Sequence, residues 1–345
     1  MTNQNNTVEK TAEETPKKKS NISSLMSKMG TLVALALLLA FFGIASSSFL
    51  TIGNMMILLK QASINCLIAS GMLVCLITAG IDLSVGYNTV LCTCVIGVLM
   101  QNFGVTNPVV LIIAGIGAST FCGFINGTLL TRLDLPHPFV STLGVKNIIW
   151  GLALLITAST PIGLLGKGID PVLFLGNETI GFGFPVSFIL VLVVYSIFNI
   201  FLNKTALGRQ IYCVGGNPEA ARLSGIKSKN VLTFVYTLSG FMCGLAGIVL
   251  CGRIASANPT EGATFDTEAI AACIIGGASF SGGKGTIWGT LLGALLMATI
   301  RNGLNSMNAP KAVQYVVIGA VIIGAVTIDV VRNKMEAKAR RMAAK

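Results

Sequence analysis

Residues 31–42 read TLVALALLLAFF, an apolar run that no charged residue enters. Further runs of the same character follow along the chain at Met72–Ala79, Val109–Ile116, Phe188–Val194 and Val316–Val326. Such runs approach or form the roughly 20-residue stretches that cross a hydrocarbon core about 30 Å thick. Because lipid offers no partner to backbone N–H and C=O groups, the spanning segments are predicted to be helices.

The composition agrees with a protein that lives in a bilayer. Hydrophobic residues make up 53% of the 345 residues and charged residues only 11%, and the mean hydropathy is +0.79. We therefore predict an all-α fold, a polytopic membrane bundle of about ten transmembrane helices. The predicted helices cover residues 31–50, 54–79, 86–103, 109–130, 138–158, 184–203, 229–251, 268–278, 286–304 and 312–331.

The segment 268–278 is too short to span as a straight helix, and glycines flank it. We predict a short or broken helix there, which is tolerated where protein or a water-filled cavity shields its backbone.

The net charge of +11 is concentrated in three segments: the amino-terminal tail, the loop 204–229 and the tail 332–345. Under the positive-inside rule these segments, and so both termini, are cytoplasmic. This clustering at predicted helix ends argues against nucleic-acid binding. We predict a disordered cytoplasmic tail at 1–29, a transmembrane domain at 30–331 and a basic cytoplasmic tail at 332–345.

A carboxylate lies directly after an apolar helix in the segment Gly80–Gly86, which contains Asp82 and Ser84. Carboxylates at membrane depth are expensive and are usually retained for a solute pathway or for a structural pairing. The neighbouring glycines let the backbone leave helical geometry, so that Asp82 and Ser84 could instead cap exposed backbone groups. Both interpretations stay open.

Two amides lie one helical turn apart in the second predicted helix, at Gln61 and Asn65. At that spacing both side chains share a face, from which they could hydrogen-bond a polar solute. Hydrogen bonds between helices explain the same residues equally well.

The loop 204–229 contains helix signals of its own. Asn217 suits an N-cap, Pro218 the first turn and Glu219 the positive end of the helix dipole, while Gly225 can end the helix. An isolated helix this short is marginal in water, so we expect it to dock on something.

Several chemistries are excluded by the residues present. A phosphate loop needs a glycine five positions before the glycine of its Gly-Lys pair and a hydroxyl residue after the lysine, but Ala278 and Gly285 occupy those places. We expect no metal site and no cofactor on this chain, because its one histidine, His137, has no ligating neighbours. An enzyme would need a nucleophile with its base, or clustered His and carboxylates.

Four segments in the same order resemble the permease subunits of ATP-binding-cassette importers for simple sugars, the family of the ribose, galactose, xylose and allose permeases. The matching segments are Gly80–Gly86, Pro138–Gly144, Gly215–Gly225 and Asp266–Gly283. Lys146, inside the fifth predicted span, departs from the family pattern. The resemblance implies a bacterial inner-membrane importer that moves a monosaccharide by alternating access.

The resemblance also implies partners and site residues. ATP and magnesium would be bound by a separate ATPase subunit, a second permease subunit (identical or paralogous) would complete the membrane domain, and an extracytoplasmic sugar-binding protein would deliver the solute. The implied coupling helix, which docks on the ATPase, comprises Asn217, Pro218, Glu219, Ala220, Ala221, Arg222, Leu223, Ser224 and Gly225.

The same resemblance places Asp82, Ser84, Phe139 and Thr142 near the solute path, in addition to Gln61 and Asn65. The alternative function is an ion-coupled secondary transporter, which would need paired titratable residues within its spans. Against this alternative, only Asp82, Lys60 and Lys146 qualify as such residues.

Overall fold

The computed structural model describes residues 19–133, 135, 137–166 and 168–343. Its helices are α1 (Lys19–Ala45), α2 (Ile52–Ile77), α3 (Val85–Phe103), α4 (Pro108–Arg132), α5 (Pro138–Ile156), α6 (Asp170–Asn177), α7 (Val186–Lys204), α8 (Ala206–Gly216), α9 (Pro218–Leu223), α10 (Ser228–Ile254), α11 (Phe265–Ile275), α12 (Ile287–Ser306) and α13 (Lys311–Ala343). Two pairs of two-residue antiparallel strands join loops: β1 (Ile162–Gly163) with β4 (Ser256–Ala257), and β2 (Thr179–Ile180) with β3 (Phe184–Pro185).

The predicted polytopic helical bundle is confirmed. Eight helical segments among the described residues are long and apolar enough to cross a membrane: α2, α3, α4, α5, α7, α10, α12 and the Lys311–Val331 part of α13. The shorter apolar stretch Gly30–Ala45 belongs to α1. α11 has 11 residues and is the short helix expected near 268–278. Together they account for the ten predicted segments.

The helix ends differ from the predicted domain boundaries at both termini. α1 begins at Lys19, inside the predicted 1–29 tail, of which residues 1–18 lie outside the described residues. α13 continues to Ala343, through most of the predicted 332–345 tail. Once a helix has nucleated, adding a residue is favourable for Ala, Lys, Arg, Met and Glu, which fill the end of α13. Hydropathy therefore located the apolar core of these helices and not their ends.

The centre of the bundle is formed by α2 and α10. Sixteen consecutive buried positions, Ala62–Ile77, fill the carboxyl-terminal part of α2, and Leu58 is a further buried position nearer its start. On α10, Gly240 lies against Gly123 of α4, and a Cβ on Gly240 would meet the Ser119 carbonyl oxygen at 2.5 Å. Small residues allow this close approach where lipid supplies no hydrophobic drive for association.

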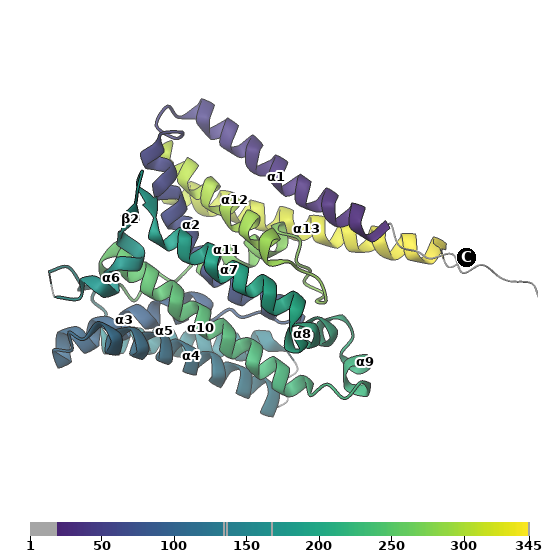
Figure 1. The fold of residues 1–345 in the computed structure, drawn as a ribbon, viewed down its shortest axis with the longest axis horizontal. Helices are drawn as coiled ribbons and strands as arrows, with labels where there is room; N and C mark the ends of the chain where they lie inside the picture. The colour runs from purple at the N-terminus through teal and green to yellow at the C-terminus, as the bar shows by residue number, and fades with distance from the viewer. Residues whose placement is uncertain (1–18, 134, 136, 167, 344–345) are drawn as a thin grey trace, which may run out of the picture.

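Different helices and loops lie at the two ends of the bundle (Figure 1). The start of α1, the end of α13 and the pair α8 and α9 lie at one end of the molecule, and α6 and β2 lie at the other. The described parts of the two predicted tails, residues 19–29 and 332–343, therefore share one end with the 204–229 loop, as the charge pattern predicts.

Candidate functional site

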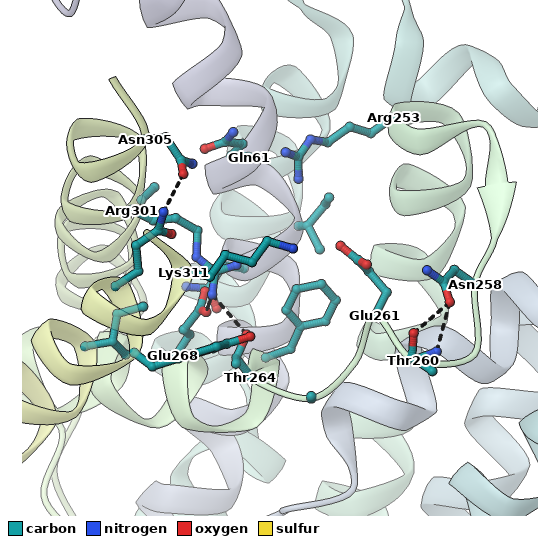
Figure 2. A pocket seen from close by; sticks show the side chains of 18 residues that line it. Gln61, Arg253, Asn258, Thr260, Glu261, Thr264, Glu268, Arg301, Asn305 and Lys311 are labelled. Atoms are coloured by element: carbon teal, nitrogen blue, oxygen red, sulfur yellow. Dashed lines mark hydrogen bonds and ion pairs between the residues drawn. The ribbon is translucent and has the colours of Figure 1, made fainter. Parts of the chain in front are cut away.

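A polar cavity of about 460 Å³ opens between α2, α11, α12 and the start of α13. The segment that joins α10 to α11 closes one side of it (Figure 2). Because these elements lie far apart in the sequence, only the folded bundle assembles the cavity. Its polar lining consists of Gln61, Asn65, Arg253, Asn258, Thr260, Glu261, Thr264, Glu268, Arg301, Asn305, Lys311, Gln314 and Tyr315.

Gln61 and Asn65 both line this cavity, as their spacing on one helix predicts. Asn65 is 6% exposed. Within the described residues, neither its Oδ1 nor its Nδ2 has a hydrogen-bond partner, and the buried Oε1 of Gln61 has none. The interpretation of this pair as hydrogen-bonding glue between helices therefore finds no contact to support it.

An ion pair crosses the cavity wall between Glu268 in the first turn of α11 and Arg301 of α12. The Arg301 guanidinium also donates to Thr264 Oγ1 at 3.0 Å. Each charge is thus held by the other and by a hydroxyl, which is the condition for keeping charges at membrane depth.

Arg253, Glu261 and Lys311 point toward the same space (Figure 2). In the described part of the chain, none of the three forms an ion pair within 4.0 Å.

The sequence analysis named none of the five charged residues of the cavity as site residues. A signal was present for Arg301, because it lies inside the predicted span 286–304, and for Glu268, which lies in the predicted broken helix. Charged residues at those positions are functional candidates by default.

Asp82 and Ser84 lie elsewhere, in a buried node between α2 and α3. Asp82 Oδ1 accepts hydrogen bonds from the Ser84 backbone N–H at 3.0 Å and from its hydroxyl at 2.6 Å. Asp82 Oδ2 accepts one from Ser239 of α10 at 2.9 Å, and Asn126 of α4 donates to Oδ1 at 3.3 Å. The carboxylate caps the break between α2 and α3 and ties it to two other helices, so the structural role that sequence reasoning left open is present. Neither Asp82 nor Ser84 lines the cavity.

Phe139 and Thr142 lie on α5, away from the cavity. Phe139 is 53% exposed, and Thr142 is fully buried with its hydroxyl donating to the Phe139 carbonyl oxygen at 3.4 Å. Their predicted place on the solute path stays a prediction.

Lys146, also on α5, is paired. Its Nζ lies 2.6 Å from Oδ2 of Asp266, which is buried at the start of α11, and 5.8 Å from the centre of the Tyr87 ring. α11 therefore carries one ion pair to α5 and another, through Glu268, to α12.

The predicted coupling helix forms α9, at the end of the molecule opposite α6 (Figure 1). Asn217 Oδ1 accepts from the Ala220 N–H at 3.0 Å, which is the N-cap expected from the sequence. Glu219 and Arg222 are paired at 2.6 Å with both side chains about two-thirds exposed, and this contact lowers the pKa of the Glu219 carboxyl. Gly225 has φ +79°, the left-handed conformation that ends a helix.

α8 connects α9 rigidly to the membrane helices. Gly215 of α8 lies so close to the end of α2 that a Cβ there would be 1.7 Å from the Ile77 carbonyl oxygen. That oxygen accepts from the Gly283 N–H at 2.8 Å, and the Tyr212 hydroxyl donates to the Gly285 carbonyl at 2.8 Å. α8 is thus joined to the loop 276–286, which links α11 to α12, the two helices that hold the ion pair of the cavity.

Comparison with known proteins identifies the family of this chain. Residues 54–326 match a family model described as the permease component of the branched-chain amino acid transport system. The chain belongs to this permease family. No solved structure matches it significantly.

The curated relatives of this permease chain cover nearly its whole length. It is 39% identical to the ribose import permease protein of Bacillus subtilis over 92% of this chain and 97% of the relative. It is 39% identical to the D-allose transport system permease protein of Escherichia coli (92% and 96%), and 38% identical to the fructose import permease protein of Rhizobium meliloti (86% and 84%). The resemblance found from the four sequence segments is confirmed, and the chain is a multi-pass membrane permease subunit.

Proposed function

We propose that this chain is the permease subunit of an ATP-driven importer that translocates a monosaccharide, a pentose or a hexose, across the cytoplasmic membrane by alternating access. The observation that carries the proposal is the similarity to import permeases for ribose, allose and fructose, at 38–39% identity over at least 84% of each chain. A polar cavity inside an otherwise apolar bundle supports it, because a solute with many hydroxyls needs hydrogen-bond partners on its way across lipid.

The partners follow from this role. ATP and magnesium belong to a cytoplasmic ATPase subunit that receives α9, a second permease subunit, identical or paralogous, completes the membrane domain, and an extracytoplasmic sugar-binding protein delivers the solute. Both termini and the 204–229 loop are assigned to the cytoplasm, because these segments carry the excess of Lys and Arg. The start of α1, the end of α13 and the loop share one end of the bundle, which supports this assignment.

The contacts of α8 supply a physical route for coupling. Movement of α9 on the ATPase displaces α8. Because the backbone of α8 contacts the end of α2 at Gly215, and the loop 276–286 is hydrogen-bonded there through Gly283, the three elements move together. That loop begins where α11 ends and finishes where α12 begins. Closely packed elements switch between discrete arrangements instead of deforming gradually. The cavity between α11 and α12 therefore changes with the state of the ATPase.

Reconstitution tests the proposed function. The chain is purified in mild detergent with its copurifying subunits and placed in vesicles with internal ATP, and uptake of labelled ribose, allose, fructose and galactose is measured. Uptake that requires ATP and survives a proton ionophore is expected. Uptake that ignores ATP and stops when the ion gradient collapses would instead establish a secondary transporter.

A further inference from the structure

The cavity between α2, α11 and α12 combines a buried wall of amides with a more exposed rim of charges. We propose that it is a monosaccharide-binding site of the permease itself, in which the side-chain amides of Gln61 and Asn65 hydrogen-bond the hydroxyls of the sugar. This inference rests on the proposed function, because it states where in the chain the transported sugar is held.

The first argument is the state of the two amides. Leaving a buried polar group unpaired forfeits its hydrogen bonds to water, and native proteins retain few such groups. Here three buried atoms on two neighbouring side chains lack a partner among the described residues, and both side chains line one cavity. Asn65 presents a donor and an acceptor, and Gln61 presents an acceptor. A sugar hydroxyl both donates and accepts, so vicinal hydroxyls complement this set.

The second argument is the charge of the rim. Arg253 and Lys311 are positive and Glu261 is negative, and all three face the cavity (Figure 2). Carboxylate oxygens accept from hydroxyls and guanidinium groups donate to them, so a rim of mixed sign suits an uncharged polyol. The remaining charges, Glu268 and Arg301, pair with each other, so neither is left unpaired in the wall of the cavity.

The third argument separates a sugar from an aliphatic amino acid, the solute class in the description of the family model. The rim could hold the two charges of an amino acid. An aliphatic side chain directed at the buried wall would, however, leave the Gln61 and Asn65 amides unpaired. A site built to hydrogen-bond hydroxyls rejects an analogue that lacks them.

The test uses the full complex of permease, ATPase and sugar-binding protein in vesicles with internal ATP. Uptake of ribose, allose, fructose, galactose and leucine is compared for the wild type, Asn65→Leu and Gln61→Leu. Ser70→Ala is the matched control, since Ser70 is buried on the same helix, outside the cavity, and its hydroxyl donates to Leu67 within α2.

We expect Asn65→Leu and Gln61→Leu to lower the uptake rate of the preferred sugar roughly three- to tenfold, the effect of one lost hydrogen bond, and to change the ratio of rates among the four sugars. A purely structural role would lower all rates together and leave that ratio unchanged. Ser70→Ala is expected to keep both rate and ratio.

The outcomes are distinguishable. Wild-type uptake of leucine and of none of the sugars would defeat the proposed function. Wild-type uptake of a sugar, with unchanged rates and ratios in both amide variants, would overturn the binding site alone and would mean that the cavity is merely hydrated. If the amide variants do not assemble, Glu261→Gln at the exposed rim replaces them, with the same expected change of ratio and the same refutation by unchanged ratios.

Discussion

Replacing Gly215 by alanine tests whether α8 transmits movement to the membrane helices. The added Cβ would lie 1.7 Å from the Ile77 carbonyl oxygen, over an ångström inside the 3.0 Å that Cβ contacts respect, and the next nearest atoms are also backbone. No side chain can rotate away, so α8 and the end of α2 must separate. Overpacking of this kind costs about 1–3 kcal/mol or more, whereas alanine favours a helix over glycine by only about 0.5–1 kcal/mol. The clash therefore outweighs the helix preference.

We expect Gly215→Ala to melt at a lower temperature in detergent and to transport less sugar per ATP hydrolysed by the reconstituted complex. The matched control is Gly216→Ala, the same change at the next residue of α8, where a Cβ would meet only the Gly283 Cα at 4.0 Å. The control should melt and transport like the wild type or slightly better. Equal melting and equal coupling in the two variants would refute the proposed rigid junction.

Three further predictions follow from single contacts. Reversing the charge in Glu219→Lys or Arg222→Glu should abolish uptake while the melting temperature stays unchanged, because an exposed ion pair in water contributes little to stability. Normal uptake and normal copurification with the ATPase in both variants would speak against α9 as the coupling helix. Lys146→Met should destabilise the protein by about 3–5 kcal/mol, because it leaves Asp266 buried and unpaired. The double variant with Asp266→Asn should recover most of the lost stability in thermal unfolding. A double variant that melts no higher than Lys146→Met would contradict this account of the pair. Asp82→Asn should lower stability by about 1–3 kcal/mol, because an amide N–H₂ would replace an oxygen that accepts from Ser84 or Ser239. The control is Asp170→Asn, the same change at an exposed position of α6. Equal melting temperatures of the two variants would show that the hydrogen bonds to Asp82 do not stabilise the protein.

Much of the helical framework could be predicted from the order of residues alone. Hydropathy is a local property, and a run such as Val316–Val326 spans a bilayer whatever its neighbours are. The caps of α9 are equally local, because Asn217 and the Ala220 N–H are three residues apart. The helix ends in polar surroundings were less predictable, as α1 and α13 show, since helix propagation there depends on small differences in propensity.

The roles of single polar residues depended on contacts across the fold. Periodicity placed Gln61 and Asn65 on one face of α2, but nothing in that helix reveals that α11, α12 and α13 open a cavity in front of it. Asp82 was open to two interpretations until Ser239 and Asn126 were seen to donate to it from α10 and α4. Lys146 departs from the family pattern, and its structural role became clear only from its ion pair with Asp266, 120 residues away in the sequence.

The sequence by itself thus determined a helical membrane bundle, the grouping of its basic segments and a small polar helix between two spans, because each depends on residues close together in the chain. Only the tertiary structure decided which charges are paired, that the α2–α3 break is capped by a carboxylate and where a polar solute can be held. A buried polar side chain is satisfied by whatever packs against it, and in a helical bundle those neighbours come from other helices.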